Sequence, residues 1–292
     1  MLRNAATWML AITCSACAAA SGENAPALDV QAGGDTSVTS RSSNAYTFPA
    51  PNLGEVERAL HLRGDVAFAQ TFVSPPAPIN AGLGPIFNNN GCQKCHVRDG
   101  RGLAATSSGS HGSTLLVRVS MPAEAETQPH GTRALEALGR QLQDHAIFGA
   151  EAEARVEVEY IEQPGAYADG EPFSLRRPVL RIALRDGEPL PGDVLTSARI
   201  PPPVFGLGLL EAVPQDDIVA LADPEDADAD GISGRPNYVW DEVHGETALG
   251  RFGWKANVPG LLQQAAEAYA QDMGVSSWLF PEADGSTELE LV

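Results

Sequence analysis

The sequence predicts a mainly helical domain with a small β insertion and long connections rich in glycine and proline. Apolar residues recur at helical spacing toward both ends of the chain, while apolar and charged residues alternate in the middle. The chain has 292 residues and is 43% hydrophobic, so it can bury a core as one large domain or two modest ones.

Helical periodicity appears twice before the middle of the chain. Residues 54–72 have apolar side chains at helical spacing, and we expect their helix to be interrupted near Gly64. Residues 132–150 show a second helical pattern, whose apolar positions lie roughly on one side of the helix: Leu135, Leu138, Leu142 and Ile147.

The middle of the chain then changes to a period of two. Residues 155–162 alternate apolar with charged side chains, which predicts a half-buried strand. Residues 175–184 end in a similar alternation, but Pro178 suits only an edge strand or the start of a strand. Residues 214–223 and 259–274 return to helical periodicity, each with proline in or before the first turn.

The N-terminus predicts export. Residues 1–20 combine Arg3, an apolar stretch too short to span a bilayer, and an alanine-rich cleavage signal, as in a secretory signal peptide. Residues 21–45 are rich in Ser, Gly and Ala, which predicts a disordered tether. We therefore expect a folded domain over residues 46–292, located in a bacterial periplasm.

The signal itself contains Cys14 and Cys17. These form a C-x-x-C pair, but Ala18 follows where a haem ligand would require histidine. Cys17 could instead be a lipidation site, although an aliphatic residue is expected at the position of Cys14. Small residues of a signal peptide are the simpler interpretation, so soluble export is preferred over a lipid anchor.

The net charge of the chain restricts the kinds of partner that it can bind. The chain has 19 Lys and Arg against 38 Asp and Glu, a formal net charge of −19. Such a surface repels a phosphate backbone, so we expect no nucleic-acid partner. A cationic partner protein or a metal cation suits it better.

The motif with the clearest chemistry is Cys92-Gln93-Lys94-Cys95-His96. On a helical turn, this C-x-x-C-H spacing places both thiols along one edge of a porphyrin, where they can form thioethers with its vinyl groups. The histidine that follows can reach over the porphyrin face to the iron as an axial ligand. The spacing predicts a covalent haem c.

Zinc and disulfide chemistry are the alternatives for this motif. Zinc would need a second pair of ligands at suitable spacing, and Cys92 and Cys95 are the last cysteines of the chain. A thioredoxin-like disulfide would need a βαβ setting, whereas loops rich in Gly and Asn surround the motif. Both alternatives are weaker than haem attachment.

The residues around the motif resemble the first haem site of the bacterial di-haem oxidoreductase family, peroxidase-like proteins also labelled thiol oxidoreductases. The similarity continues in order along residues 46–283, in the blocks GLGPIFNNNGCQKCHVRDGRG, RQLQDHAIFG, YADGEPFSLRRP, VFGLGLLEAVP, DADADGISGRPN, GRFGWKA and AYAQDMGVSSWLFPE. The resemblance implies a cytochrome-c-like helical fold with inserted β structure. It also implies redox chemistry at haem, similar in plan to di-haem peroxidases.

One departure from the family matters. The resemblance implies a second C-x-x-C-H in a C-terminal cytochrome-like domain, and the printed sequence has none after residue 96. A truncated or split product, or a one-haem derivative, would explain this. A second haem-bearing chain is therefore an expected partner, together with a small electron-donor protein and with peroxide as the oxidant.

The sixth iron position separates catalysis from electron transfer. By chemistry alone the candidates are His61, His111, His130, His145, His244, Met121 and Met273. His145 is favoured as a distal ligand or acid/base group, because it lies in a predicted helix within a family-like block. Met273 could cap a low-spin haem, although a core methionine is the commoner use.

Two further sets of residues are candidates for binding. Arg98 and Arg101 flank the haem motif and could pair with the haem propionates, or could be ordinary surface charges. Asp226, Asp228 and Asp230 alternate before a glycine, as at the start of a calcium loop. Asn237 replaces the final glutamate, so this is not a true EF-hand, and a surface acidic loop is the alternative.

Three functions therefore stay open. The first is an exported peroxidase-like haem oxidoreductase whose acid/base group is His145 or an acidic residue. The second is a non-enzymatic electron-transfer cytochrome with six-coordinate haem. The third is a fragment that requires a partner chain with the second haem.

Overall fold

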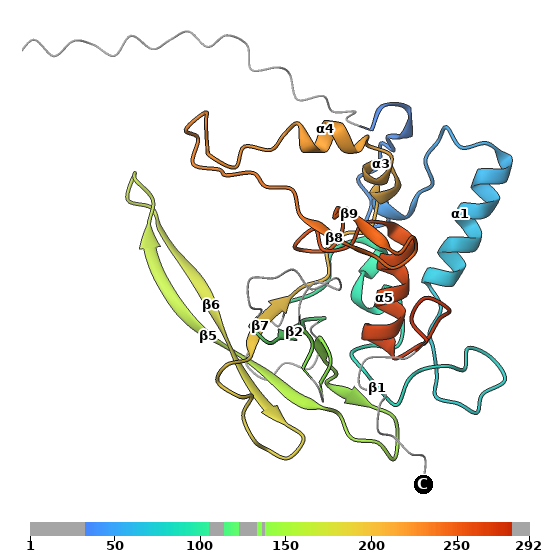
Figure 1. Ribbon diagram of the computed structural model, residues 1–292, viewed down its shortest axis with the longest axis vertical. Coiled ribbons are helices and arrows are strands. Elements are labelled where there is room, and N and C mark those ends of the chain that lie inside the picture. Colours follow the sequence, from blue (N-terminus) through green and yellow to red (C-terminus); the bar gives the residue numbers. More distant parts are fainter. Residues whose placement is uncertain (1–32, 105–113, 123–132, 136–137, 282–292) are drawn as a thin grey trace, which may run out of the picture.

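The computed structural model describes residues 33–104, 114–122, 133–135 and 138–281 (Figure 1). The helices are α1 (Glu55–Phe68), α2 (Cys92–Cys95), α3 (Leu207–Glu211), α4 (Gln215–Val219) and α5 (Leu261–Met273), with 3-10 turns at Gly34–Thr36, Ala45–Thr47 and Val97–Asp99. The strands are β1 (Ile86–Phe87), β2 (Leu116–Ser120), β3 (Gln141–Leu142), β4 (His145–Ala146), β5 (Ala154–Ala166), β6 (Pro172–Leu184), β7 (Leu195–Arg199), β8 (Tyr238–Asp241) and β9 (Glu246–Leu249).

The predicted fold class is wrong, because the chain is not mainly α. Helix accounts for 22% and strand for 27% of the structure, in several antiparallel sheets. Most of the difference comes from β5 and β6, which pair from Ala154↔Leu184 to Ala166↔Pro172 as a long ribbon that projects from the body (Figure 1). The alternation in this region indicated the strands but not their length.

The predicted helix over residues 132–150 is also wrong. Its described part contains β3, β4 and a turn at Gly139, whose φ of 62° is left-handed. Leu142 is 1% exposed and pairs with Val117 of β2. Pairing with β2 buries this leucine in a sheet, and that tertiary contact overrides the helical preference of the segment.

The other predicted helices and strands form, but the predicted interruption near Gly64 is wrong. Helix α1 forms, but it runs through Gly64 without the expected interruption, and none of its residues is fully buried. Helices α4 and α5 follow Pro214 and Gly260. Pro178 lies within β6, where it pairs with Tyr160 in a ribbon of only two strands, so each strand is an edge.

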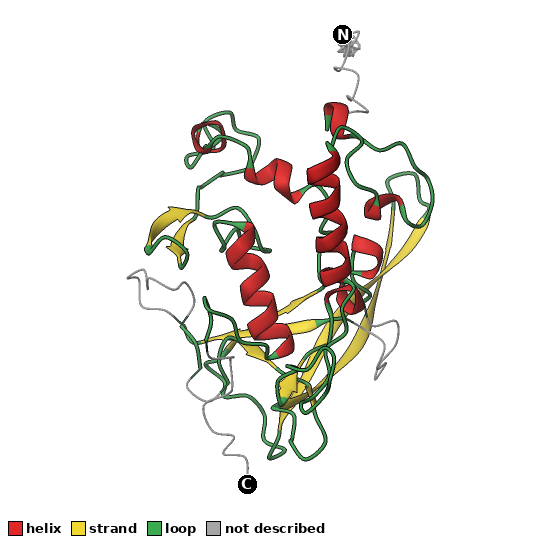
Figure 2. Ribbon diagram, turned by 90° about the vertical axis from the view of Figure 1, so that its right-hand side faces the viewer, coloured by secondary structure: helices red, strands yellow, loops and turns green. Residues whose placement is uncertain are grey.

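Two apolar clusters hold these elements together. One joins the three-stranded sheet β3-β2-β7 to the start of β5 through Val117, Val119, Leu135, Leu142 and Ala154. The other packs Phe72, Leu83 and Met273 against Cys92. Figure 2 shows α1 and α5 as the two long helices of the body. Among the described residues, no helix is long and apolar enough to cross a membrane.

The C-terminal end of α5 anchors the loop that leads into α2. The backbone N–H groups of Asn88 and Asn89 donate to the carbonyl of Asp272 at 2.8 and 3.1 Å, and Gly84 donates to Met273 at 2.9 Å. These bonds satisfy carbonyls that the end of a helix leaves without partners. A Cβ on Gly84 would lie 2.6 Å from the Cα of Gly274, so the close approach requires glycine. The arrangement fixes the cysteine turn against α5.

Candidate functional site

The C-x-x-C-H segment forms a single helical turn, as predicted. The backbone N–H of His96 donates to the carbonyl of Cys92 at 2.8 Å and closes the turn. Both cysteines are half-buried free thiols. The turn therefore presents two thiols and an imidazole from one short piece of backbone.

A distant proline orients the imidazole of His96. Its Nδ1 lies 2.7 Å from the carbonyl oxygen of Pro202. Since a carbonyl only accepts, Nδ1 carries the proton, and Nε2 keeps its lone pair for a metal. Burial lowers the pKa of His96, which also favours the neutral ring.

Gly102 lets the proline segment come this close. Its N–H donates to the carbonyl of Pro201 at 2.9 Å. A Cβ at this position would lie 2.7 Å from Cδ of Pro201 and 3.0 Å from the carbonyl oxygen of Cys95. Only glycine leaves room for both segments, so the short Gly-rich stretch after the motif has a packing function.

The electrostatics of the thiols disfavour the two alternatives to haem. Burial, followed by the charge of Asp272, raises the pKa of Cys95 to about 12 and also raises the pKa of Cys92. Zinc binding and thiol exchange both use the thiolate, which this environment suppresses. Across the described residues, the three-ligand clusters that could hold a metal ion do not include either cysteine. A neutral thioether fits this environment.

A cavity of about 750 Å³ lies directly over the motif. This volume falls within the roughly 300–1,000 Å³ typical of ligand and cofactor sites. It is lined by α1, α2, α3, α5 and the segment 199–208, and much of its wall is aromatic or apolar. Phe68 of α1 lies beside the His96 ring, with centroids 6.1 Å apart. The cavity can hold a large, flat, mostly apolar group.

Unpartnered polar atoms also face this space. Asp99 Oδ1, Asn257 Oδ1 and Gln264 Oε1 are buried without a hydrogen-bond partner among the described residues, and all three residues line the cavity. Buried polar atoms are nearly always paired, so such exceptions indicate a missing partner. Together with the two thiols and the imidazole, they fit a large cofactor that also carries polar groups.

Sequence reasoning left the acidic residues of the cavity unassigned. Glu267 and Asp272 of α5 both line it. Burial raises the pKa of each carboxyl, so each holds a proton to higher pH than usual. Gln263 Nε2 donates to Glu267 Oε1 at 3.0 Å, and Gln141 Nε2 donates to Asp272 Oδ1 at 2.7 Å. The sequence signal that could have identified Glu267 and Asp272 is the presence of acidic residues within the amphipathic stretch 259–274.

The structure places His145 away from this site. It lies on β4 instead of a helix, stacks on Phe87 with centroids 5.9 Å apart, and does not line the cavity. Its Nδ1 lies 2.9 Å from Asp144 Oδ1, and that hydrogen bond raises the pKa of His145. The geometry does not support a distal role for His145.

The remaining ligand candidates fall in different places. Met273 lines the cavity, is 3% exposed, and packs in the apolar cluster beside Cys92. His61 also lines the cavity, from α1, whereas Met121 and His244 do not. His111 and His130 lie outside the described residues.

The flanking arginines do not reach into the cavity. Arg98 and Arg101 are both exposed and are absent from its lining. Arg101 instead lies over the ring of Trp254, with Cζ 5.9 Å from the ring centroid. The arginines that do line the cavity are Arg118 and Arg199, which sequence reasoning missed because they are distant from the motif.

The acidic loop converges on a different set of residues from the predicted one. Carboxylate oxygens of Asp223, Asp226 and Asp228 lie within 4.8 Å of one another. Asp230 is not in this group, and its Oδ1 accepts from the backbone N–H of Ile232 at 2.7 Å. Calcium binding by Asp226 and Asp228 stays a prediction, with Asp223 in place of Asp230.

These features define a class of protein that holds a large cofactor against a C-x-x-C-H turn. A family model described as "Di-haem oxidoreductase, putative peroxidase" matches residues 28–117 and 119–289. Because the match covers most of the chain, the protein belongs to the di-haem oxidoreductase family, and the resemblance seen in the sequence blocks is confirmed. The family implies haem as the cofactor. No curated protein and no solved structure matches the chain.

Proposed function

We propose that the protein is an exported c-type haem oxidoreductase with peroxidase-like activity. Cys92 and Cys95 would hold one haem through thioethers, and His96 would be its proximal ligand. The observation that carries the proposal is the hydrogen bond between His96 Nδ1 and the Pro202 carbonyl, because it leaves Nε2 available at the wall of a cofactor-sized cavity. When bound, the haem supplies an iron at which peroxide is reduced with electrons from a donor.

The chain itself must supply a proton for cleavage of the peroxide O–O bond. Glu267 is the best candidate, because it lines the cavity and burial raises its pKa. Gln263 bonds to Oε1, which leaves Oε2 to carry the proton. Glu267 therefore takes the acid/base role that the sequence left to His145 or an acidic residue.

An electron-transfer cytochrome is the second candidate function. Met273 favours it, because its thioether lines the cavity beside the cysteine turn. Sulfur bound to the iron would close the position that peroxide needs. The burial of Met273 among Phe72 and Leu83 equally suits a core methionine, so the peroxidase-like function is preferred.

The surroundings of the protein are also proposed. The signal-like residues 1–20 support export to a periplasm. The net charge of −19 suits a small cationic electron donor, since complementary charge speeds encounter. The family description names two haems, which makes a haem-bearing chain a candidate partner.

The test is to export the protein from a host with c-type haem maturation and to measure its mass and ferric absorption spectrum. We expect one covalent haem per chain and a high-spin spectrum that changes on addition of cyanide or peroxide. The C92S/C95S double variant should retain no haem after denaturation. A wild-type chain without covalent haem would overturn the proposal, and a low-spin spectrum indifferent to both ligands would support the cytochrome.

A further inference from the structure

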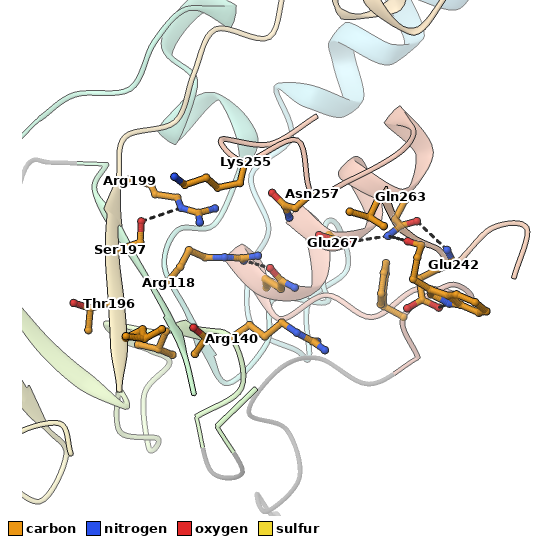
Figure 3. Close-up of a pocket in the computed structure, with 17 residues that line it drawn as sticks. Arg118, Arg140, Thr196, Ser197, Arg199, Glu242, Lys255, Asn257, Gln263 and Glu267 are labelled. Atoms are coloured by element: carbon orange, nitrogen blue, oxygen red, sulfur yellow. Dashed lines mark hydrogen bonds between the residues drawn. The ribbon is translucent and has the colours of Figure 1, made fainter. Parts of the chain in front are cut away.

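A second, smaller cavity of about 180 Å³ adjoins the large one. Figure 3 shows the residues that line the smaller cavity. Arg118, Arg199, Asn257, Glu267 and Gln271 line both spaces, so the two cavities share a wall. Lys255 lines the smaller cavity as well. In Figure 3, Arg199 and Lys255 lie at the end of this cavity away from Glu242.

Strand geometry explains why two arginines lie in this wall. Arg118 of β2 pairs with Ser197 of β7, which makes Arg199 its diagonal neighbour on the same face of the sheet. The alternate residues Val117 and Val119 are 1% and 2% exposed in the core on the other face. The period of two therefore directs both guanidinium groups away from the core and toward the cavities.

No salt bridge compensates the positive charge of this wall within the part of the chain that the structure describes. Arg118, Arg199 and Lys255 form no ion pair with a carboxylate of any residue that the structure describes. Glu267 and Asp272 are near enough to sense the charge of Arg118, but burial raises the pKa of both carboxyls and favours their neutral forms. Burial and the charge of Arg118 also lower the pKa of Arg199. An anion between these cations would relieve the repulsion.

Among the residues that the structure describes, each guanidinium keeps donors for such an anion. Arg199 Nε donates to Ser197 Oγ at 3.3 Å, which leaves its two terminal nitrogens. Arg118 Nη1 donates to Gln141 Oε1 at 3.0 Å and to Gln271, which holds the side chain and leaves Nη2. Planar forks of this kind bind carboxylates in paired hydrogen bonds.

We propose that Arg118, Arg199 and Lys255 form a carboxylate site that holds the propionates of the haem, with the smaller cavity as the propionate end of the cofactor cavity. The inference rests on the proposed haem attachment. Thioethers to the cysteine turn would hold the vinyl edge of a porphyrin, and its two carboxylates would then extend from the opposite edge. Arg118 and Arg199 are the arginines that line the large cavity, whereas Arg98 and Arg101 are exposed outside it.

A free oxyanion such as phosphate has the same chemistry and could occupy the smaller cavity instead. The shared wall favours the propionates, because Arg118 and Arg199 face the cofactor cavity as well as the smaller one. The two sources differ in one respect. Propionates arrive with the haem and then exclude other anions, whereas a free-anion site would still bind phosphate in the haem-loaded protein.

The experiment compares R118Q and R199Q with the matched controls R98Q and R101Q, all in the haem-loaded protein. We expect covalent haem in every variant. The reduction potential should fall in R118Q and R199Q by about 59 mV, a tenfold change in the one-electron equilibrium constant. The reason is that a negative propionate without its cationic partner stabilises the oxidised iron relative to the reduced iron. R199K keeps the charge without the fork and should lie between R199Q and wild type.

Two further measurements keep the inference testable if a variant folds poorly. With haem carrying ¹³C at the propionate carboxyls, redox-difference infrared bands of the carboxylates should shift in R118Q and R199Q and stay fixed in R98Q. Inorganic phosphate should not raise the melting temperature of the haem-loaded wild type. Two outcomes would overturn the propionate assignment without affecting covalent haem attachment. One is that the variants have equal reduction potentials and equal carboxylate infrared bands. The other is that phosphate raises the melting temperature in a way that depends on Arg118. Absence of covalent haem in the wild type would instead overturn the proposed function.

Discussion

The Nδ1 atom of His96 lies 2.7 Å from the carbonyl oxygen of Pro202, across 106 positions of the sequence. The contact joins the cysteine turn to the segment that follows β7, and it determines which ring nitrogen is available for a metal. The C-x-x-C-H motif thus supplies an imidazole, and a distant backbone carbonyl sets its tautomer and direction.

Replacing Gly102 with alanine tests this contact. The new Cβ would press on Pro201 and on the carbonyl of Cys95, so we expect a loss of about 1–3 kcal/mol of unfolding free energy and a lower melting temperature. G192A is the control, since a Cβ on Gly192 meets nothing within 4 Å, and its effect should stay within about 0.5 kcal/mol. Equal melting of G102A and the wild type would show that the proline segment adapts freely.

Glu267→Gln tests the acid/base assignment. The amide cannot deliver a proton, so peroxidase kcat should fall by about 10²–10⁴-fold while the haem spectrum is retained. E188Q, at an exposed turn, should keep wild-type kcat. In the wild type, kcat should decline as pH rises through the raised pKa of Glu267. If E267Q retains full activity with the same pH profile, another residue donates the proton.

The pH dependence of stability provides a separate check on Glu267. Burial raises its pKa in the folded state, so its neutral form stabilises the fold, and this contribution is lost as pH rises through that raised pKa. The E267Q variant stays neutral at every pH. Its unfolding free energy relative to the wild type should therefore increase as pH rises, measured by denaturant titration at several pH values. A difference that is constant with pH would contradict the raised pKa.

Met273→Leu separates the two candidate functions. Because Met273 packs among Phe72 and Leu83, leucine should cost less than about 1.5 kcal/mol of stability and leave the ferric spin state unchanged. Conversion of a low-spin spectrum to a high-spin one in M273L would identify Met273 as the sixth ligand. That result would favour the electron-transfer cytochrome.

Calcium binding by the acidic loop can be tested by thermal unfolding with calcium or with a chelator. If Asp223, Asp226 and Asp228 bind the ion, calcium at one hundred times its Kd should add about 2.7 kcal/mol of stability. D226N should abolish the increase, and D230N should reduce it less, because Asp230 lies outside the cluster. Identical melting with and without calcium would leave this loop as an acidic surface segment.

The features that sequence determined are those encoded by neighbouring residues. The cysteine turn, helices α1, α4 and α5, and the strands of the hairpin β5–β6 follow from local spacing, the placement of proline and alternation. The family also follows from the order of its motifs along the chain. These local patterns hold where no tertiary contact overrides the preferred period of the segment.

Tertiary structure decided which distant segments meet. Residues 138–150 show helical spacing but pair as strands, because Leu142 is buried against Val117 in a sheet with β2. Pro202, Glu267, Arg118 and Arg199 line the cavity from elements far from the motif, while Arg98, close to it in sequence, is exposed. No local pattern encodes these positions, because burial and pairing depend on contacts between residues that lie far apart in the chain.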